Sequence, residues 1–131
     1  SRALHTSVSA PQIEVFIETL SSAIREKIRS LLPMAARAGM LAAGASAVDD
    51  ALQKGRVEML IFAEDISEGT KHKLRTGGLP PKRQATLFTR DELGQMVGRE
   101  LVGVVAILDK GFSDAVWSES ERLKGLLNKH L

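Results

Sequence analysis

GMLAAGASAVDDALQKGRVEMLIFA, residues 39–63, combines a glycine-rich turn, a helical segment and an apolar run. Its glycines lead into a helical segment in which Ser46 and Asp49 have the spacing of a capping box, with Asp in place of the usual Glu. Gly55 is expected to end that helix. The next segment, 57–63, is mostly apolar and has the length of a strand, which predicts a strand buried within the sheet.

The same stretch of sequence resembles a phosphate-binding loop that lacks its lysine. A P-loop has Gly, four residues, Gly, Lys and then Ser or Thr. Gly39, Gly44 and Ser46 fit that spacing, but Ala45 stands where the Lys belongs, and the residues before Gly39 have a helical pattern. A P-loop follows a buried strand instead, so nucleotide hydrolysis is disfavoured. Two interpretations stay open: a tight turn at Gly44, or a helix N-terminus whose N–H groups attract a phosphate.

Upstream of this stretch, an apolar stripe at helical spacing predicts a long helix over Gln12–Leu31. Pro11 suits its first turn, whereas Pro33 is expected to end it and to open a second short helix, Pro33–Gly39. Such a stripe needs cover from the domain or from a partner, because large exposed apolar patches are uncommon on monomers. The stripe consists of Ile13, Ile17, Leu20, Ile24, Ile28 and Leu31.

Downstream, strands and helices alternate. Thr89 and Glu92 form a second capping box, and Asp109 is placed to cap the last helix. This alternation predicts an α/β protein, a three-layer α/β/α sandwich around a small mixed sheet, with an extra N-terminal helix. Strands are expected at 85–88 and 101–109, and helices at 64–78, ending at Gly77 or Gly78, at 90–98 and after Asp109.

Length and composition indicate one ordinary domain. The chain has 131 residues, of which 44% are hydrophobic and 26% charged, as in soluble globular proteins. Residues 1–10 are polar and aperiodic, and we expect a tail or the end of a preceding domain there, followed by a single domain over 11–131. The longest apolar run, 101–108, is far too short to span a membrane.

Several chemistries are disfavoured by the residue inventory. The absence of cysteine excludes disulfides and thiolate zinc sites, and it suits the reducing cytoplasm where we place the protein. The three histidines are too scattered for a local metal site, and no Ser/His/Asp arrangement is visible. We therefore expect neither enzymatic activity nor a cofactor or metal.

The net charge of +2 hides an uneven distribution. Residues 69–90 contain no acid, and the bases gather there. This segment is either a solvated basic loop or the source of a local positive field for a polyanion such as RNA. Its basic residues are Lys71, His72, Lys73, Arg75, Lys82, Arg83 and Arg90.

Two long stretches resemble one protein family. LLPMAARAGMLAAGASAVDDALQKGRVEMLIFAEDIS and FTRDELGQMVGRELVGVVAILDKGF are similar to the L-seven-Ae ribosomal-protein family and its L-thirty-e relatives, most of all to bacterial YlxQ-type members. The likeness covers about residues 31–117. The segment SRALHTSVSAP also resembles the end of a YlxR-type domain, which implies that this chain is the C-terminal part of a longer fusion protein.

This resemblance implies an α/β/α sandwich that binds structured RNA, including ribosomal RNA and kink-turns, without catalysis. The family motif at the glycine turn is Gly-x-Asn-Glu-x-x-Lys. Gly44 matches its Gly, whereas Ser46, Ala47 and Asp50 replace its Asn, Glu and Lys. The implied kink-turn motif is therefore degenerate.

A second RNA-facing loop is implied at Gly98–Gly103. There Arg99 is suited to contact phosphate. Leu101 and Val102 either pack on an exposed base or simply start the strand. Together with the turn, the candidate RNA-binding residues are Arg37, Gly44, Ser46, Lys54, Arg56, Lys71, Lys73, Arg75 and Arg99.

Two alternatives to an RNA-binding domain linked to translation stay open. One is a protein-interaction module on the same fold, with a partner or a second copy docking on the helix Gln12–Leu31. The other is a substrate-recognition domain for an RNA-modifying enzyme, which would need a separate catalytic domain.

Overall fold

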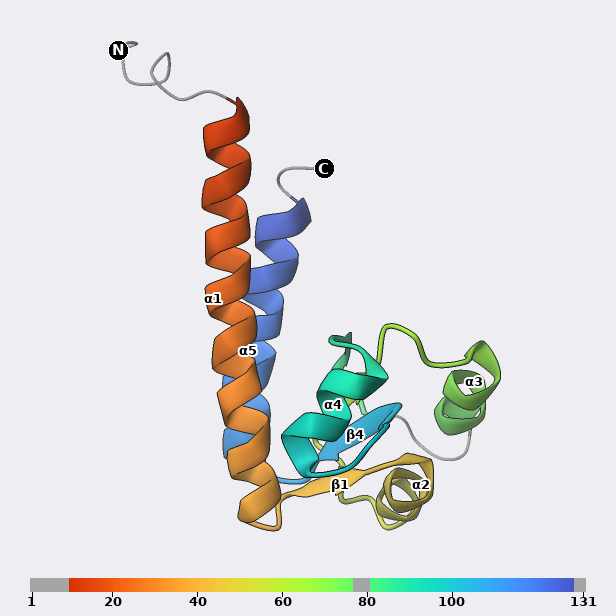
Figure 1. Cartoon of the computed structure of the whole chain (residues 1–131). Helices are drawn as coiled ribbons and strands as arrows, with labels where there is room; N and C mark the ends of the chain where they lie inside the picture. The colour runs from red at the N-terminus through yellow and green to blue at the C-terminus, as the bar shows by residue number, and fades with distance from the viewer. Residues whose placement is uncertain (1–9, 77–80, 129–131) are drawn as a thin grey trace.

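The computed structural model describes residues 10–76 and 81–128, without the side chains of residues 75 and 76. Figure 1 shows a sheet flanked by helices, from which two long helices project. The elements, in chain order, are α1 (Ala10–Arg37), β1 (Leu41–Ala43), α2 (Ala45–Gln53), β2 (Met59–Phe62), α3 (Glu68–Thr76), β3 (Gln84–Thr86), α4 (Arg90–Val97), β4 (Val104–Ile107) and α5 (Lys110–Asn128).

The four strands form one mixed sheet in the order β1-β4-β2-β3. β4 pairs with β1 and with β2 in antiparallel fashion, whereas β2 and β3 are parallel. The two central strands, β2 and β4, are buried throughout their length. Their apolar runs therefore predicted buried strands correctly, although β4 is shorter than the expected range 101–109.

Helices cover both faces of this sheet. On one face, Met59, Ile61 and Ile107 pack in a cluster with buried side chains of α1, α4 and α5. On the other face, Leu60 and Phe62 pack in a second cluster with buried side chains of α2 and α3. Alternate residues of each strand point to opposite faces, which divides the core in two. The expected three-layer α/β/α sandwich with an extra N-terminal helix is confirmed.

The expected break at Pro33 is wrong, because α1 runs without interruption to Arg37 with the proline inside it. A proline inside a helix lacks the hydrogen bond to the carbonyl four residues earlier, and its ring crowds that carbonyl. On either side of Pro33, Leu32 and Ala35 are buried against the domain. The packing of this segment holds the helix together across the missing bond.

The start of α2 also differs from the expectation. The segment Leu41–Ala43 forms β1 and was not predicted as a strand. The helix begins directly after it, with Gly44 as the N-cap and no side-chain cap, so the capping box expected at Ser46 and Asp49 is wrong. A tertiary contact explains the difference. The Gly44 N–H donates a hydrogen bond to the Val104 carbonyl, so the chain stays paired with β4 as far as the N-cap residue.

Two other expected caps are confirmed. Thr89 and Glu92 make both hydrogen bonds of a capping box at the start of α4. The carboxylate of Asp109 accepts a hydrogen bond from the Phe112 N–H at the start of α5. The expected end of the third helix at Gly77 or Gly78 lies outside the described residues.

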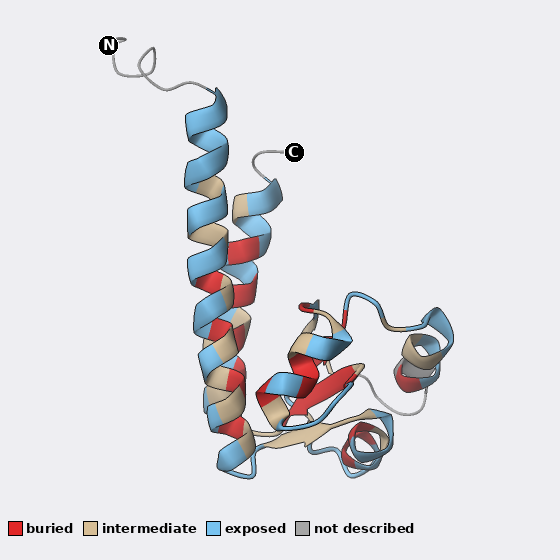
Figure 2. Cartoon of the chain, viewed as in Figure 1, coloured by how far each residue is buried: buried red, intermediate tan, exposed pale blue. Residues whose placement is uncertain are grey.

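α1 and α5 run side by side in opposite directions and project from the sheet, and the first turns of α1 extend past the end of α5 (Figure 1). Figure 2 shows that burial along α1 is confined to its second half. Ile24 and Ile28 are buried, whereas Ile13 is 37% exposed. The expected apolar stripe is therefore covered by the domain over only part of its length. α1 begins at Ala10, one residue before the expected domain boundary at residue 11.

Candidate nucleic-acid interface

The N-terminus of α2 is the centre of the candidate interface. Gly44 has φ 93° and ψ 155°, a backbone conformation that is essentially restricted to glycine. No side chain caps α2. The backbone N–H groups of its first turn, which include those of Ala45 and Ser46, therefore point out of the helix end. Such a helix end attracts an anion.

The turn between α4 and β4 is joined to this helix end through Arg99. α4 ends at Gly98 in the left-handed conformation, and the Arg99 N–H donates to the Gly94 carbonyl. The Arg99 Nη1 donates a hydrogen bond to the carbonyl oxygen of Ala43 at 3.0 Å. A guanidinium is thus held beside Gly44, where it adds positive charge to the N-terminal end of α2.

Close backbone packing positions this turn. A Cβ atom at Gly94 would lie only 2.4 Å from the carbonyl oxygen of Glu100. The glycine in the middle of α4 therefore allows the turn that carries Arg99 to lie directly on the helix.

A cleft of about 460 Å³ lies along the free edge of β1. Arg56 and Arg99 lie in its wall together with Asp50. Arg37 follows Ala36, another lining residue, and its side chain is exposed. Two of the sequence-predicted cations, Arg56 and Arg99, therefore line this cleft.

Two further hollows lie on the other side of the helix end. A groove of about 390 Å³ between α2 and α3 brings Ser46 and Lys73 together with Asp49 and Thr70. A smaller hollow of about 230 Å³ lies between the start of α2, the segment that leads into α3, the start of α4 and the turn before β4, and is lined by Ala45, Ile66, Ser67, Thr70, Arg90, Leu101, Gly103 and Val104.

The remaining predicted cations are less available to a ligand. The Lys54 Nζ lies 3.0 Å from a carboxylate oxygen of Asp50, one helical turn away. The Lys71 ammonium lies 5.4 Å from the centroid of the Phe62 ring, and its side chain is half-buried. Arg75 belongs to α3, but its side chain lies outside the described part.

Two of the described bases of the acid-free segment 69–90 are paired with acids from other parts of the chain. Arg83 Nη1 lies 2.6 Å from Asp114 Oδ1 on α5, and the guanidinium covers the Trp117 ring at 5.8 Å. Arg90 is paired with Asp65 at 3.4 Å. These two cations are therefore paired with carboxylates from other parts of the sequence.

These interactions also shift the pKa values of the carboxylates. The pKa of Asp114 is lowered, first by its hydrogen bond from Arg83. The pKa of Asp65 is lowered chiefly by the hydrogen bond from the backbone N–H of Arg90.

The two apolar residues of the second loop both precede β4 and differ in burial. Val102 is buried, whereas Leu101 is 56% exposed. Leu101 and Arg90 line the same hollow. The sequence analysis counted Arg90 among the bases of segment 69–90 but did not select it for the site, because nothing local to it shows that the chain folds it beside Leu101.

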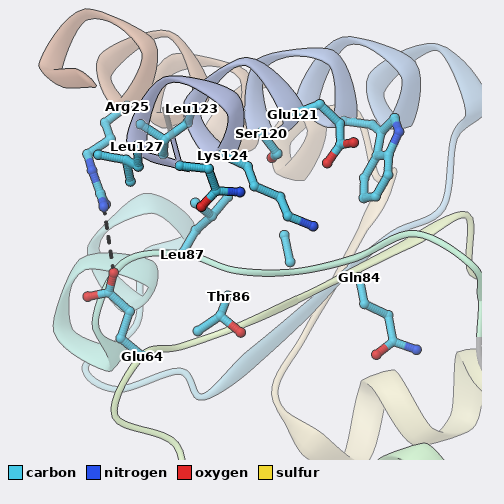
Figure 3. A pocket seen from close by; sticks show the side chains of 13 residues that line it. Arg25, Glu64, Gln84, Thr86, Leu87, Ser120, Glu121, Leu123, Lys124 and Leu127 are labelled. Atoms are coloured by element: carbon cyan, nitrogen blue, oxygen red, sulfur yellow. Dashed lines mark ion pairs between the residues drawn. The ribbon is translucent and has the colours of Figure 1, made fainter. Parts of the chain in front are cut away.

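A groove of about 470 Å³ lies on another side of the domain, between the edge strand β3 and the second half of α5 (Figure 3). The Arg25–Glu64 ion pair, at 3.8 Å, lies at one end. Glu121 and Lys124 lie along the α5 side. Because bases and acids alternate around it, this groove lacks the positive field that a polyanion requires.

Fold and helix-end geometry together define a small α/β/α domain with an anion-attracting turn. Residues 26–117 match the Ribosomal protein L7Ae/L30e/S12e/Gadd45 family, and the chain belongs to that family. The match covers most of the chain, including both turns of the candidate interface.

Solved structures agree with this assignment. The chain is similar to a protein of unknown function from Bacillus halodurans, with 31% identity, a TM-score of 0.59, and coverage of 78% of this chain and 97% of that chain. It also shares its fold with the 15.5 kD RNA binding protein of Giardia lamblia, at 15% identity and a TM-score of 0.60, with coverage of 79% and 90%. No curated protein sequence matches it.

The described helices include none with the length and apolar character of a membrane span. Within the same residues, no three His, Asp or Glu side chains are grouped as ligands of a metal ion.

Proposed function

We propose that this chain is a non-catalytic RNA-binding domain whose RNA contact surrounds the N-terminus of α2. The observation that carries the proposal is the hydrogen bond from Arg99 to Ala43, which holds a cation beside an uncapped helix end. Family membership supports the same conclusion, as does the fold shared with a Giardia protein described as RNA-binding.

The geometry supports a contact dominated by phosphate. Ser46, Ala47 and Asp50 are exposed in the first turns of α2, where the family resemblance implies Asn, Glu and Lys. Asp50 is an acid at this surface, although Lys54 partly neutralises it. A base edge would find one hydroxyl there, so standard kink-turn recognition should be weak.

We assign the phosphate contacts to exposed cations around the helix end. The cations that we assign to phosphate on the β1 side are Arg37, Arg56 and Arg99. On the α3 side, Lys73 contacts phosphate. We propose that the bound RNA is structured ribosomal RNA. As a YlxQ-type member, the chain would act in translation in the cytoplasm. Its place in a YlxR-type fusion stays a prediction.

A salt titration of binding to a pool of structured RNAs tests this proposal. With about three to five phosphate contacts, the slope of log affinity against log salt should be on the order of −2 to −4. Arg56→Ala and Arg37→Ala should each weaken binding to all RNAs and make the slope shallower by somewhat under one unit. Lys124→Ala, which removes the same charge from α5, is the matched control and should change nothing.

If the wild-type chain shows no salt-dependent binding at low ionic strength, the RNA proposal is wrong. An equal effect of Lys124→Ala would show that only the overall charge matters, which would also contradict the assigned surface.

The degenerate motif has its own test. The wild type should bind a consensus kink-turn weakly, and the triple change Ser46→Asn, Ala47→Glu and Asp50→Lys should strengthen that binding. A gel-shift assay gives both affinities. Nanomolar binding by the wild type would contradict our interpretation of the motif, as would a triple variant that gains nothing.

A second function, that of a protein-interaction module, is favoured by a separate observation. Val15 and Phe16 of α1 are 62% and 64% exposed, far from the helix end that faces RNA.

A further inference from the structure

The groove between β3 and α5 runs along an edge of the sheet. β3 is the last strand in the sheet order, and no strand among the described residues pairs with its outer side. On its inner side, the Leu87 N–H donates a hydrogen bond to the Phe62 carbonyl of β2. Alternate residues of a parallel strand direct their backbone groups to opposite sides. The N–H and C=O groups of Gln84 and Thr86, which both line the groove, therefore point away from β2.

The other edge of the sheet is partly closed. β1 forms that edge, and the carbonyl oxygen of Ala43 accepts the hydrogen bond from the Arg99 side chain at 3.0 Å. On β3, by contrast, Thr86 is exposed. Unpaired backbone groups of an edge strand readily accept a further strand. Of the two edges, β3 is the one at which the structure leaves room for it.

The groove also offers apolar surface next to these backbone groups. Ala85 and Leu87 of β3 pack in the core cluster on the face of the sheet that α5 covers. Leu123 of α5, which belongs to the same cluster, lines the groove, and the more exposed Leu127 lies at one end of it. A bound strand uses such a combination: main-chain hydrogen bonds provide affinity, and alternate side chains provide specificity.

Two charged side chains of α5 indicate which peptide fits. Glu121 and Lys124 line the groove, are exposed, and make no ion pair among the described residues. Figure 3 shows their order: from the Gln84 end toward Leu127, Glu121 comes first and Lys124 second. Alternate residues of an added strand would face α5. A base opposite Glu121 and an acid opposite Lys124, separated by one residue, would complement both charges.

We infer that this groove binds an extended peptide segment of a partner protein, which adds to the sheet as a fifth strand antiparallel to β3. Antiparallel pairing is the slightly more stable of the two arrangements. From its N-terminus, the segment carries an apolar residue over Leu123, an acid opposite Lys124 and a base opposite Glu121, with one residue between each. The groove lies on another side of the domain from the α2 helix end, so this inference does not rest on RNA binding.

The first experiment tests the charge order by fluorescence anisotropy. The probes are a labelled heptapeptide, Thr-Leu-Thr-Glu-Thr-Lys-Thr, and a peptide of the same composition with Glu and Lys exchanged. The wild type should bind the first peptide about fivefold more tightly, because the exchange replaces two attractive contacts by repulsive ones. The double change Glu121→Lys and Lys124→Glu, at two exposed positions, should reverse this preference. An unchanged preference in the double variant would overturn the assigned contacts.

The second experiment tests strand addition itself. The N–H groups of the two inner threonines of the first peptide would face β3, whereas those of its Glu and Lys would face away. N-methylation of the two threonines should therefore abolish binding, and N-methylation of Glu and Lys should not. Thr86→Pro removes one outward N–H at an edge position that tolerates proline. It should weaken binding about fivefold with little change in melting temperature.

The controls separate this groove from other surfaces. Arg56→Ala, which removes an exposed cation outside the groove, should leave peptide affinity unchanged. Sedimentation of the chain alone should give the monomer mass at the concentrations of the titration. A dimer that Thr86→Pro dissociates would mean that a second copy occupies the edge, which would overturn the inference. It would also be overturned by equal effects of the two N-methylated peptides, or by no binding of the first peptide at millimolar concentration.

Discussion

The guanidinium of Arg99 donates a hydrogen bond to the carbonyl oxygen of Ala43, 56 residues away in sequence, at 3.0 Å. This bond ties the α4–β4 turn to the last residue of β1, directly before Gly44. The two loops implied by the family resemblance thus form one surface, held in place by backbone groups of the sheet.

Gly44→Ala should disturb both the fold and this surface. Its φ of 93° is strained for alanine, and the added Cβ would lie 3.1 Å from Arg99 Nη1. We expect a loss of about 1–3 kcal/mol in the free energy of unfolding and a clear loss of RNA affinity. Urea unfolding and RNA titration measure the two effects.

Gly55→Ala is the matched control for that change. Gly55 also has a positive φ, 67°, but nothing lies within 4 Å of its added Cβ. It should cost about 1–2 kcal/mol and leave RNA affinity unchanged. Equal loss of affinity in both variants would show that Gly44 has no particular role at the interface.

Gly94→Ala tests the packing of the α4–β4 turn. Alanine is the better helix former, but its Cβ would lie 2.4 Å from the Glu100 carbonyl oxygen and 2.7 Å from that of Arg99. Overlap with backbone outweighs propensity, so we expect destabilisation of about 1–3 kcal/mol. Gly125→Ala in α5, where nothing lies within 4 Å, should instead stabilise by about 0.5–1 kcal/mol. A neutral Gly94→Ala would mean that the turn moves aside freely.

Glu92 makes stability depend on pH. Its pKa is lowered below the ordinary value of 4.5, first by the side-chain hydrogen bond from Arg29 and then by the backbone N–H of Thr89. A carboxyl whose pKa is lower in the folded chain contributes stability above its unfolded pKa and loses it as the pH falls through the folded value. The free energy of unfolding should therefore fall as the pH drops below about 5.

Glu92→Gln should flatten that acid-side dependence, because the substituted amide does not titrate. Denaturant melts from neutral pH down to acid measure the slope. Asp91→Asn, at an exposed position of the same turn with no hydrogen bond or ion pair among the described residues, should keep the wild-type slope. If the Glu92→Gln and wild-type slopes coincide, the Arg29 contact contributes nothing in solution.

Ser120→Ala should be neutral or stabilising. The Ser120 Oγ is buried and has no hydrogen-bond partner among the described atoms. The free energy lost by removing this hydroxyl from water is therefore not offset by a hydrogen bond. Removing it should raise the free energy of unfolding by up to about 1–3 kcal/mol. Ser113→Ala is the contrast: that buried hydroxyl accepts a hydrogen bond from Arg83 at 3.0 Å, and its loss should destabilise. Thermal melts that rank the two variants in the reverse order would contradict this account.

Much of the fold follows from local pattern alone. The apolar runs in β2 and β4 encode burial on both faces, and the spacing of Thr89 and Glu92 encodes a helix start that needs no distant partner. Gly44 also marked the right turn. Each of these features leaves its mark in residue type and short-range spacing, so a single sequence suffices to predict it.

Tertiary contacts decided the rest. β1 is a strand because β4 lies beside it, and α1 continues through Pro33 because its neighbours are packed against the domain. The sequence left open whether the bases of segment 69–90 form a solvated loop or a local positive field, and in the structure Arg90 and Arg83 are paired with Asp65 and Asp114. The position of Arg99 depends on the Ala43 carbonyl and on the missing Cβ of Gly94. Each of these outcomes depends on groups far apart in sequence, whose meeting is set by the packing of the whole sheet and not by local periodicity.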